Sequence, residues 1–368
     1  MRKLLRNLLI CFTLLLAVIL PGCGDTEAPL ENDPTQSTEV EEIAPSDDAD
    51  APFKVTMLDV GQGLSILIES DGEYMIYDGG GRSYSSYVVS YLKKHNIDEL
   101  EYMFVSHYDE DHIAGLVGVL NTCEVDTAVT PDYTADSAIY RSFRDMLKNN
   151  GADEEHPLAG DSYTLGNADI QVLSPHDYAG NDENDASIVI KVTYGNYSCI
   201  ITGDAEENAE SEMVSSGADI DSDLYVVGHH GSASSSSESF VRAVSPEYAF
   251  ISVGENNRYG HPAQQTIDLL NSLGIKIFRT DMQGEVTAFS DGNRYWVDSE
   301  PAEEEDRQTE PSDTGYDGTY VINKNSGKFH YPDCTSVDDM KEENKVYSDE
   351  SRTKLIKEGY SPCGNCNP

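Results

Sequence analysis

The stretch FVSHYDEDHIAGL, residues 104–116, places two histidines and three acids in the six positions from His107 to His112. It follows an apolar run and leads into the apolar pattern of a helix, so these side chains fall on a strand-to-helix connection. Carboxylates this close repel one another, and each resists losing its water. A bound cation removes both objections. The stretch therefore predicts a metal site where a strand ends.

Strand and helix patterns alternate through residues 53–297. Helical spacing of apolar residues predicts helices over 84–92 and 112–120, and Gly195-Asn196 predicts the turn of a hairpin. Apolar runs predict strands at 53–60, 64–70, 73–80, 102–106, 186–194, 197–204, 223–228 and 249–254. We therefore expect an α/β fold whose functional side chains gather at strand ends.

Further candidate ligands follow other predicted strands. Asp204 follows the apolar run SCIIT, and His229 and His230 follow LYVVG. Imidazole and carboxylate ligands suit zinc or manganese. Together with residues 107–112 they are numerous enough for two divalent ions, which in such sites lie roughly 3.5–4 Å apart and clamp a phosphate ester.

The motifs SHYDEDH, TGD and HHGS, in this order and at this spacing, resemble the metallo-β-lactamase fold, an αββα sandwich. Within that fold, MLDVGQG, YDGG, NDASIVI, TGDAEE, VVGHHGS and RYGHP resemble the soluble domain of ComEC-type DNA-uptake competence proteins. The resemblance extends from about residue 55 to 289, and it implies hydrolysis by a hydroxide held between two metal ions.

The resemblance also implies roles for single residues. His107 and Asp109 would bind one metal and Asp111 and His112 the other, with Asp204 as the bridge. His230 would complete the second site, and it is preferred to His229 because related hydrolases place the ligand in a His-x-Ser pattern. The catalytic set implied is Asp111 together with His261 of the YGHP motif. His261, or the hydroxyl of Ser232, would support the substrate or the leaving oxygen; the alternative for His261 is a loop histidine whose hydrogen bonds are satisfied within the protein.

The sequence departs from the family at two places. Most ComEC-like chains have an acid after VGQG, where this chain has Leu64. Many hydrolases of the wider fold have a histidine just before the SIVI strand, where the candidates here are Asn184 and Asp185. With Asp185 as a candidate ligand, the first metal site is expected to be weaker or to hold a harder ion such as manganese.

Other acids and histidines have more ordinary interpretations. Asp59 and Asp78 are expected to be hydrogen-bonding residues of turns and loops rather than ligands. His95, His156 and His176 have no partner pattern, and we expect them on the surface.

The N-terminus predicts export. Residues 1–22 combine a basic start with an apolar run, as in a secretory signal, and LPGC resembles a lipobox that would place lipid on Cys23. An uncleaved N-terminal anchor is the alternative. Residues 23–52 predict a disordered acidic tether, followed by the hydrolase domain at 53–297 and an acidic linker at 298–313. We expect a lipid-anchored protein on the extracellular face of the cell membrane.

The remaining segment, 314–368, has the ligand spacing of a zinc module. His330-x3-Cys334 and Cys363-x2-Cys366 offer four ligands, and a segment this short buries little core without a metal. Three thiolates and one imidazole leave no open coordination position, so this zinc would be structural. The tail resembles the zinc module of Ada-type DNA-repair proteins, with a histidine where that pattern has cysteine. A disulfide between Cys123 and Cys199 is left open.

Charge bears on the substrate. The formal net charge is −43, and no stretch shows a run of Lys or Arg, whereas nucleic-acid binding normally uses a basic surface. We expect a phosphodiesterase or nuclease whose substrate is DNA or another phosphodiester, with short or single-stranded targets accepted more easily than a duplex. The alternatives are hydrolysis of cell-envelope esters, of phosphocholine or teichoic-acid type, and a surface-binding lipoprotein with an inactive site. The sequence predicts no oligomeric state.

Overall fold

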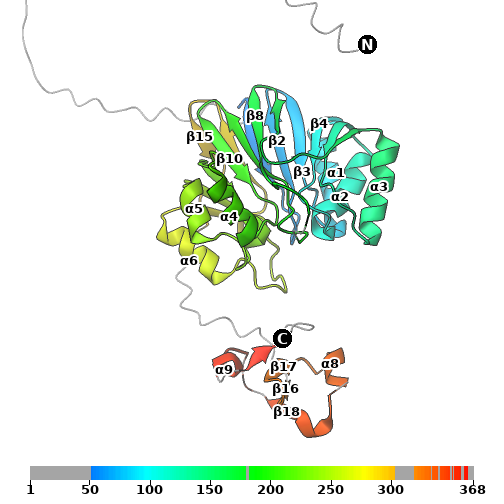
Figure 1. The fold of residues 1–368 in the computed structure, drawn as a ribbon, viewed down its shortest axis with the longest axis vertical. Helices are drawn as coiled ribbons and strands as arrows, with labels where there is room; N and C mark the ends of the chain where they lie inside the picture. The colour runs from blue at the N-terminus through cyan, green and yellow to red at the C-terminus, as the bar shows by residue number, and fades with distance from the viewer. Residues whose placement is uncertain are drawn as a thin grey trace, which may run out of the picture. The chain divides into compact units, whose positions relative to one another are not determined.

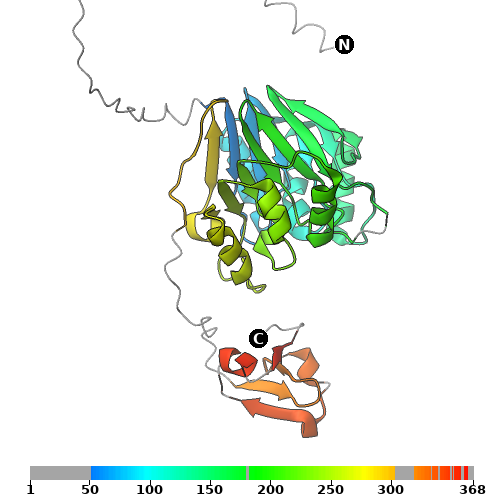
Figure 2. The same ribbon diagram turned by 60° about the vertical axis from the view of Figure 1, so that its left-hand side comes forward.

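The computed structural model describes residues 51–179, 182–302, 319–332, 334–338, 340–348, 350, 352–357 and 360–363. Described residues up to 302 form two β-sheets with helices on their outer faces, and those from 319 form a third, smaller sheet (Figures 1 and 2). The predicted signal, most of the acidic tether and Cys23 lie outside the described residues. No helix among the described residues is long and apolar enough to cross a membrane.

The first sheet has eight strands in the order β15-β14-β1-β2-β3-β4-β5-β6. Strands β3 to β6 run parallel, and the others pair antiparallel. The bounds are β1 Phe53–Met57, β2 Ile66–Ser70, β3 Glu73–Tyr77, β4 Glu99–Phe104, β5 Glu124–Val129, β6 Asp153–Glu155, β14 Val286–Ser290 and β15 Tyr295–Val297.

The second sheet has seven strands in the order β13-β12-β11-β10-β9-β8-β7. Strands β10 to β13 run parallel, and β9 and β10 form the hairpin predicted at Gly195-Asn196. The bounds are β7 Ser162–Leu165, β8 Ala168–Ser174, β9 Val189–Tyr194, β10 Tyr197–Ile201, β11 Leu224–Val226, β12 Tyr248–Ile251 and β13 Lys276–Arg279.

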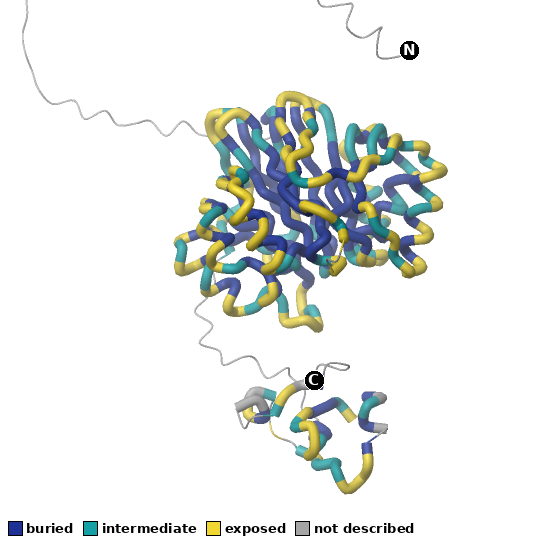
Figure 3. Tube along the Cα trace, in the orientation of Figure 1, coloured by how far each residue is buried: buried dark blue, intermediate teal, exposed yellow. Residues whose placement is uncertain are grey.

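The two sheets pack face to face through alternating side chains. In β1, Phe53, Val55 and Met57 point into the core between the sheets, whereas Lys54 and Thr56 point to the other face. The second sheet contributes, among others, Ile188, Ile190, Val192, Ile201, Val226 and Phe250. Figure 3 shows this layer as continuous buried chain.

Helices cover the outer face of each sheet, so the layers follow the predicted αββα order (Figure 1). Helices α1 Ser85–Lys94, α2 Glu110–Leu120 and α3 Ala138–Asn150 bury their apolar faces with residues of the first sheet. Helices α4 Glu207–Ser216, α5 Glu238–Val244 and α6 Gln264–Ser272 do the same on the second sheet. The shorter elements are η3 Arg82–Tyr84, η4 Gly228–Gly231 and α7 Thr280–Gln283.

Beyond β15 the chain is hydrogen-bonded to β14 of the first sheet and then to β13 of the second. The backbone N–H of Asp298 donates to Thr287, and that of Ala302 donates to Ile277 of β13. Most of the predicted acidic linker, from residue 303, lies outside the described residues.

The third sheet has the order β18-β16-β17-β19. Its elements are β16 Tyr320–Asn323, β17 Lys328–His330, α8 Thr335–Asp338, η5 Glu342–Asn344, β18 Lys345–Ser348, α9 Arg352–Lys357 and β19 Ser361–Pro362. Its buried residues form two clusters of five and four members among the described residues, so the apolar core of this segment is small.

Candidate metal centre

The candidate ligands meet at one edge, where strands of both sheets end. His107 follows β4, Asp204 follows β10, and His229 and His230 follow β11. Helix α2 begins at Glu110, and its first turn carries Asp111 and His112. Because β4, β10 and β11 lie in the parallel parts of their sheets, their carboxyl ends face a shared edge.

The ligand atoms form two overlapping groups. His107, His112 and Asp204 make the first group, and Asp111, His112 and His230 make the second, with donor atoms in each within 4.8 Å of one another. Nε2 of His112 lies 3.2 Å from Oδ1 of Asp204. Nε2 of His230 lies 3.5 Å from Oδ2 of Asp111 and 3.7 Å from Oδ2 of Asp204. Asp204 therefore stands between the two groups, where the sequence predicted a bridge.

Several of these atoms are buried without a hydrogen-bond partner. Nε2 of His107, His112 and His230 and Oδ1 of Asp204 are all in this state. Leaving a buried polar atom unpaired is costly, and native proteins keep few of them. Imidazole nitrogens and carboxylate oxygens that converge without other partners are the donor set of zinc and manganese sites. The residues present therefore fit a divalent cation.

The electrostatics of the cluster favour positive charge. Burial alone would raise the pKa of Asp204, but His112 and His230 outweigh it and hold that pKa well below its usual range. Burial alone would lower the pKa of His112, but Asp204 and Asp78 outweigh it and raise that pKa. The carboxylates thus draw protons onto the imidazoles, and a metal ion would take the place of those protons.

Asp78 orients His112. The carboxylate of Asp78 is fully buried and accepts from Nδ1 of His112 at 2.7 Å, from the Ser106 hydroxyl at 2.6 Å and from the Ser106 N–H at 2.9 Å. Because the Ser106 hydroxyl donates to Asp78, its oxygen accepts from Nδ1 of His107 at 2.9 Å. Both imidazoles are thereby held with Nε2 toward the ligand cluster.

The sequence interpretation of Asp78 as a hydrogen-bonding loop residue is correct in kind but missed this role. The available signal was an acid that follows a strand and precedes three glycines. That strand, β3, pairs in parallel with β4, and His107 comes after β4.

We expect Asp78→Asn to weaken metal binding by about 10- to 100-fold. The asparagine amide would donate to Nδ1 of His112 and place the proton on Nε2, which is the atom needed for the metal. Titration of the metal-free chain with Mn²⁺ or Zn²⁺ measures the change. Asp59→Asn is the control, because Asp59 only accepts from the Gly61 N–H at 3.2 Å, which an asparagine oxygen can also do. Equal affinities in the two variants would contradict the orienting role.

The two adjacent histidines are held differently. Nδ1 of His230 lies 2.9 Å from the carbonyl oxygen of Ser252, and Nδ1 of His229 lies 3.0 Å from Oε1 of Glu206. Nε2 of His229 lies 3.6 Å from Asp204 but is partly exposed, whereas His230 is buried. His230 belongs to a ligand group, in line with the preference from the sequence, and His229 stands beside it.

Asp78, His229 and His230 have left-handed backbones, with φ of 58°, 49° and 56°. Residues other than glycine adopt this conformation rarely, and such strain is concentrated at functional sites.

Asp185 has a structural role that the sequence did not predict. Its Oδ1 accepts from the N–H groups of Glu206 and Ala209, and its Oδ2 accepts from Asn208, so both oxygens are used at the start of α4. Asn184 donates to Glu206. The structure therefore corrects the expectation that Asp185 serves as a ligand of the first metal, because its lone pairs are directed to the helix.

The acid of this loop that lies against the first group is Glu183. Burial and the neighbouring Asp109 carboxylate raise the pKa of Glu183, and His107 acts on it in the opposite direction. Oδ2 of Asp109 lies 3.7 Å from Nε2 of His107, but Asp109, predicted as a ligand of the first metal, belongs to neither ligand group. Glu183 was missed because a single sequence does not show which acid of NDEND comes near Asp109.

His261 lies next to the histidine pair. Its ring is 5.7 Å from that of His229 in an edge-to-face arrangement, and its Nδ1 is 3.5 Å from the side-chain nitrogen of Gln62. Burial and the neighbouring histidines lower the pKa of His261 to about 4. His261 is therefore neutral near pH 7 and is suited to hydrogen bonding rather than to permanent ion pairing.

The hydroxyl of Ser232 lies 2.9 Å from that of Ser234, within the same loop. Leu64 is buried, and its N–H donates to the carbonyl oxygen of Asp111. Leu64 occupies the position at which the family resemblance implies an acid, and its backbone supports the start of α2.

The three remaining histidines lie away from the ligand cluster. His95 stacks on Tyr91, His156 contacts Thr130, and His176 is exposed near Glu212.

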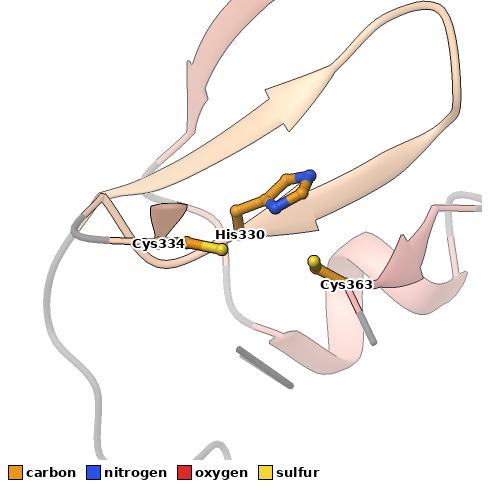
Figure 4. Close-up of side chains that lie close together, drawn as sticks. All are labelled: His330, Cys334 and Cys363. Atoms are coloured by element: carbon orange, nitrogen blue, oxygen red, sulfur yellow. The ribbon is translucent and has the colours of Figure 1, made fainter. Parts of the chain in front are cut away.

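A second cluster lies in the C-terminal segment. His330 at the end of β17, Cys334 before α8 and Cys363 after β19 are buried, with ligand atoms within 4.8 Å of one another (Figure 4). Both ring nitrogens of His330 are buried without a hydrogen-bond partner. Strands β17 and β19 pair in parallel, and the Cys363 N–H donates to Phe329, which brings Cys363 next to His330. The predicted fourth ligand, Cys366, lies outside the described residues.

Comparison with known proteins identifies the family. The model of the "Metallo-beta-lactamase superfamily" matches residues 58–255, more than half of the chain. The chain belongs to the metallo-beta-lactamase superfamily. Members of this superfamily are generally metal-dependent hydrolases, and the matched range contains every candidate ligand of the hydrolase domain.

Two curated relatives have names of the competence system or of a ComE operon. This metallo-beta-lactamase superfamily chain is 31% identical to "ComE operon protein 3" of Bacillus subtilis over 251 residues, which cover 63% of this chain and 32% of the relative. It is 30% identical to "Competence protein ComA" of Neisseria gonorrhoeae over 234 residues, covering 62% and 31%. The predicted ComEC-type resemblance is confirmed, and the chain matches about a third of the length of these relatives.

Among solved structures, the metallo-beta-lactamase fold protein YhfI of Bacillus subtilis matches with a TM-score of 0.44 and 13% identity, covering 67% of this chain and 99% of that chain.

Proposed function

We propose that this protein is a metal-dependent phosphodiesterase with nuclease-like activity, anchored by lipid on Cys23 at the outer face of the cell membrane. The observation that carries the proposal is the convergence of three buried, unpartnered imidazole nitrogens on the buried carboxylate of Asp204. Membership of a hydrolase superfamily and the similarity to competence proteins support it.

The residues of the metal centre have separate proposed roles. His107, His112, His230, Asp111 and Asp204 would hold two divalent cations, zinc or manganese, with Asp109 beside the first. When bound, such cations activate water and polarise phosphoryl oxygens.

Residues around the ligands set their geometry. Asp78, Ser106 and the Ser252 carbonyl fix the rings of the ligating histidines before substrate arrives. Neutral His261, at the open side of His229, is placed to hydrogen-bond a substrate or leaving-group oxygen.

The phosphodiester class follows from the relatives and from the donor set. The ComEC-type resemblance implies a role in DNA uptake, and paired cations suit a charged ester with two oxygens to clamp. The acidic composition opposes tight binding of a long duplex, so short or single-stranded substrates are proposed as the preferred form.

A substrate panel tests this proposal. The full chain, loaded with Mn²⁺ or Zn²⁺, is assayed with single-stranded and duplex DNA, with bis(4-nitrophenyl) phosphate and with 4-nitrophenyl phosphocholine. We expect turnover of the first three, fastest with the single strand. Turnover of the phosphocholine ester alone would replace the proposal with envelope-ester hydrolysis. Normal metal content with no turnover of any substrate would indicate a binding protein.

We also propose that the C-terminal segment holds one structural zinc ion through His330, Cys334, Cys363 and Cys366. A site with four protein ligands leaves no position for substrate, and binding energy would offset the small core. Burial lowers the pKa of His330, which favours the neutral imidazole that binds metal.

Cys363→Ser tests the zinc proposal. We expect the variant to lose about one zinc ion per chain, because three remaining ligands do not close the tetrahedral shell, while the hydrolase domain keeps its metals. Elemental analysis of the full chain and proteolysis of the C-terminal segment measure this. Cys123→Ser is the control, since Cys123 is a buried free cysteine of the hydrolase domain. Unchanged zinc content in Cys363→Ser would reject the site.

A further inference from the structure

The loop 255–263 borders the metal centre and is braced by one side chain. Nδ2 of Asn257 donates to the carbonyls of Gly254 and His261, and its Oδ1 accepts from the N–H groups of Tyr259 and His261. These four hydrogen bonds fix the loop from inside, so the side chains at its tip have a defined position without a ligand.

Tyr259 sits at the tip of this loop with an exposed ring. Tyr259 is 51% exposed, which makes it one of the most exposed aromatic residues that the structure describes. The ring stacks on His261 at 5.7 Å and 28°, and His261 in turn contacts His229. Tyr259 is thus joined to the metal centre by a continuous series of rings.

Arg258 accompanies this ring. Its guanidinium carbon lies 5.0 Å from the centre of the Tyr259 ring, and its Nη2 donates to the Tyr259 hydroxyl at 2.9 Å. Arg258 is an exposed residue, so its guanidinium is accessible to an incoming anion from solvent. This chain has 24 Lys and Arg residues against 67 acids, so cationic side chains are scarce. A cation beside the metal centre is therefore a candidate contact for a substrate phosphate.

A second tyrosine and arginine, Tyr84 and Arg82, lie near the same edge of the metal centre. The ring of Tyr84, 37% exposed, packs on Gly61 so closely that a Cβ there would meet it at 2.6 Å. Arg82 is two residues away and pairs with Glu110. Gln62, next to Gly61, contacts His261, which connects the two pairs.

We propose that Tyr259 and Arg258 form a nucleotide subsite for single-stranded nucleic acid, with a base stacked on Tyr259 and its phosphate paired with Arg258. This inference rests on the proposed function and specifies its substrate. Exposed aromatic rings interleaved with cations bind single strands, because an unpaired base offers a free face. The bases of a duplex are stacked on one another and offer no free face, and a duplex brings more negative charge to the acidic surface of this protein.

Binding tests the subsite without turnover. A fluorescent phosphorothioate oligothymidylate of about ten nucleotides, which resists hydrolysis, is titrated with the metal-loaded full chain. We expect Tyr259→Leu to weaken binding about 5- to 100-fold and Tyr259→Phe to retain most of it, because stacking needs only the ring. Arg258→Gln should lower the slope of log K against log salt by about 0.7, the value for one phosphate of a single strand.

Two matched variants serve as controls. Tyr347→Leu removes another exposed tyrosine, 61% exposed in the C-terminal segment, and Arg242→Gln removes an exposed arginine paired with Glu238. Both should bind like the unmodified chain. Equal affinity of Tyr259→Leu and the unmodified chain, or no binding of the oligonucleotide at all, overturns the inference.

Kinetics separate this inference from the proposed function. Tyr259→Leu should lower the ratio of kcat/KM for the oligodeoxynucleotide to kcat/KM for methyl 4-nitrophenyl phosphate, which carries no base. An equal loss on both substrates overturns the subsite but leaves the phosphodiesterase. Oligonucleotide binding that depends on Tyr259, in a chain that hydrolyses no phosphodiester, keeps the subsite and rejects the proposed function.

Discussion

Asp204→Ala should abolish turnover and metal binding together. Among the described acids, Asp204 alone has its carboxylate within 4.0 Å of Nε2 of His107, His112, His229 and His230, so its loss removes the centre of the ligand cluster. Changes to residues that merely orient ligands already cost about 10- to 100-fold in such sites, so we expect a loss of more than about 10³-fold in kcat/KM here.

The variant also has a readout independent of activity. A ligand that binds only the native state stabilises it, by about 2.7 kcal/mol at 100 times its Kd. The unmodified chain should therefore melt at a higher temperature with Mn²⁺ or Zn²⁺, and Asp204→Ala should show much less of this increase. Asp268→Asn is the matched control, because Asp268 is an exposed acid bonded to Gln264 of the same helix. Retained turnover in Asp204→Ala would remove the bridging assignment.

Gly115→Ala should strongly destabilise the fold and disturb the centre. Helix α2 crosses the loop after β3 so closely that a Cβ at Gly115 would lie 1.7 Å from the carbonyl oxygen of Gly79. The obstacle is backbone and cannot rotate away. Overpacking of this kind costs about 1–3 kcal/mol or more. The shift would also move the first turn of α2, with Asp111 and His112, away from Asp78.

Gly118→Ala, on the same helix, is the control. A Cβ there meets the hydroxyl of Ser85 at 2.5 Å and a methyl of Val89 at 3.1 Å, both at the ends of side chains that can adjust. Alanine also improves helix propensity by about 1 kcal/mol over glycine. Urea unfolding and metal titration of the two variants should differ clearly, with only Gly115→Ala losing both stability and metal affinity. Similar unfolding curves would show that the backbone contact at Gly79 is not limiting.

The ligand types of the centre were predictable because their signal is local. The acids and histidines of residues 107–112 lie between the end of β4 and the first turn of α2, and Asp204 and His230 come shortly after apolar strands. Strand ends of a parallel sheet meet at one edge whatever the details of packing, so the pattern was enough to place these residues together.

The partners of those ligands were not predictable, because they depend on which strand ends become neighbours. Asp78 reaches His112 across 34 positions of sequence, and Glu206 reaches His229 across 23. Asp185 and Glu183 are two residues apart in one acidic loop, yet the first caps α4 and the second lies against Asp109. Loop direction, which decides between them, leaves no periodic pattern in a sequence.

By itself, the sequence determined the family, the αββα layers and the chemical character of two candidate metal sites, because apolar periodicity and ligand spacing act over short stretches of chain. Only the tertiary structure decided which imidazole nitrogen faces the cluster, which acid serves as a helix cap, and that Tyr259 and Arg258 stand at the rim of the centre. These features arise where loops from separate strands pack against one another, and such contacts are set by the geometry of the whole domain.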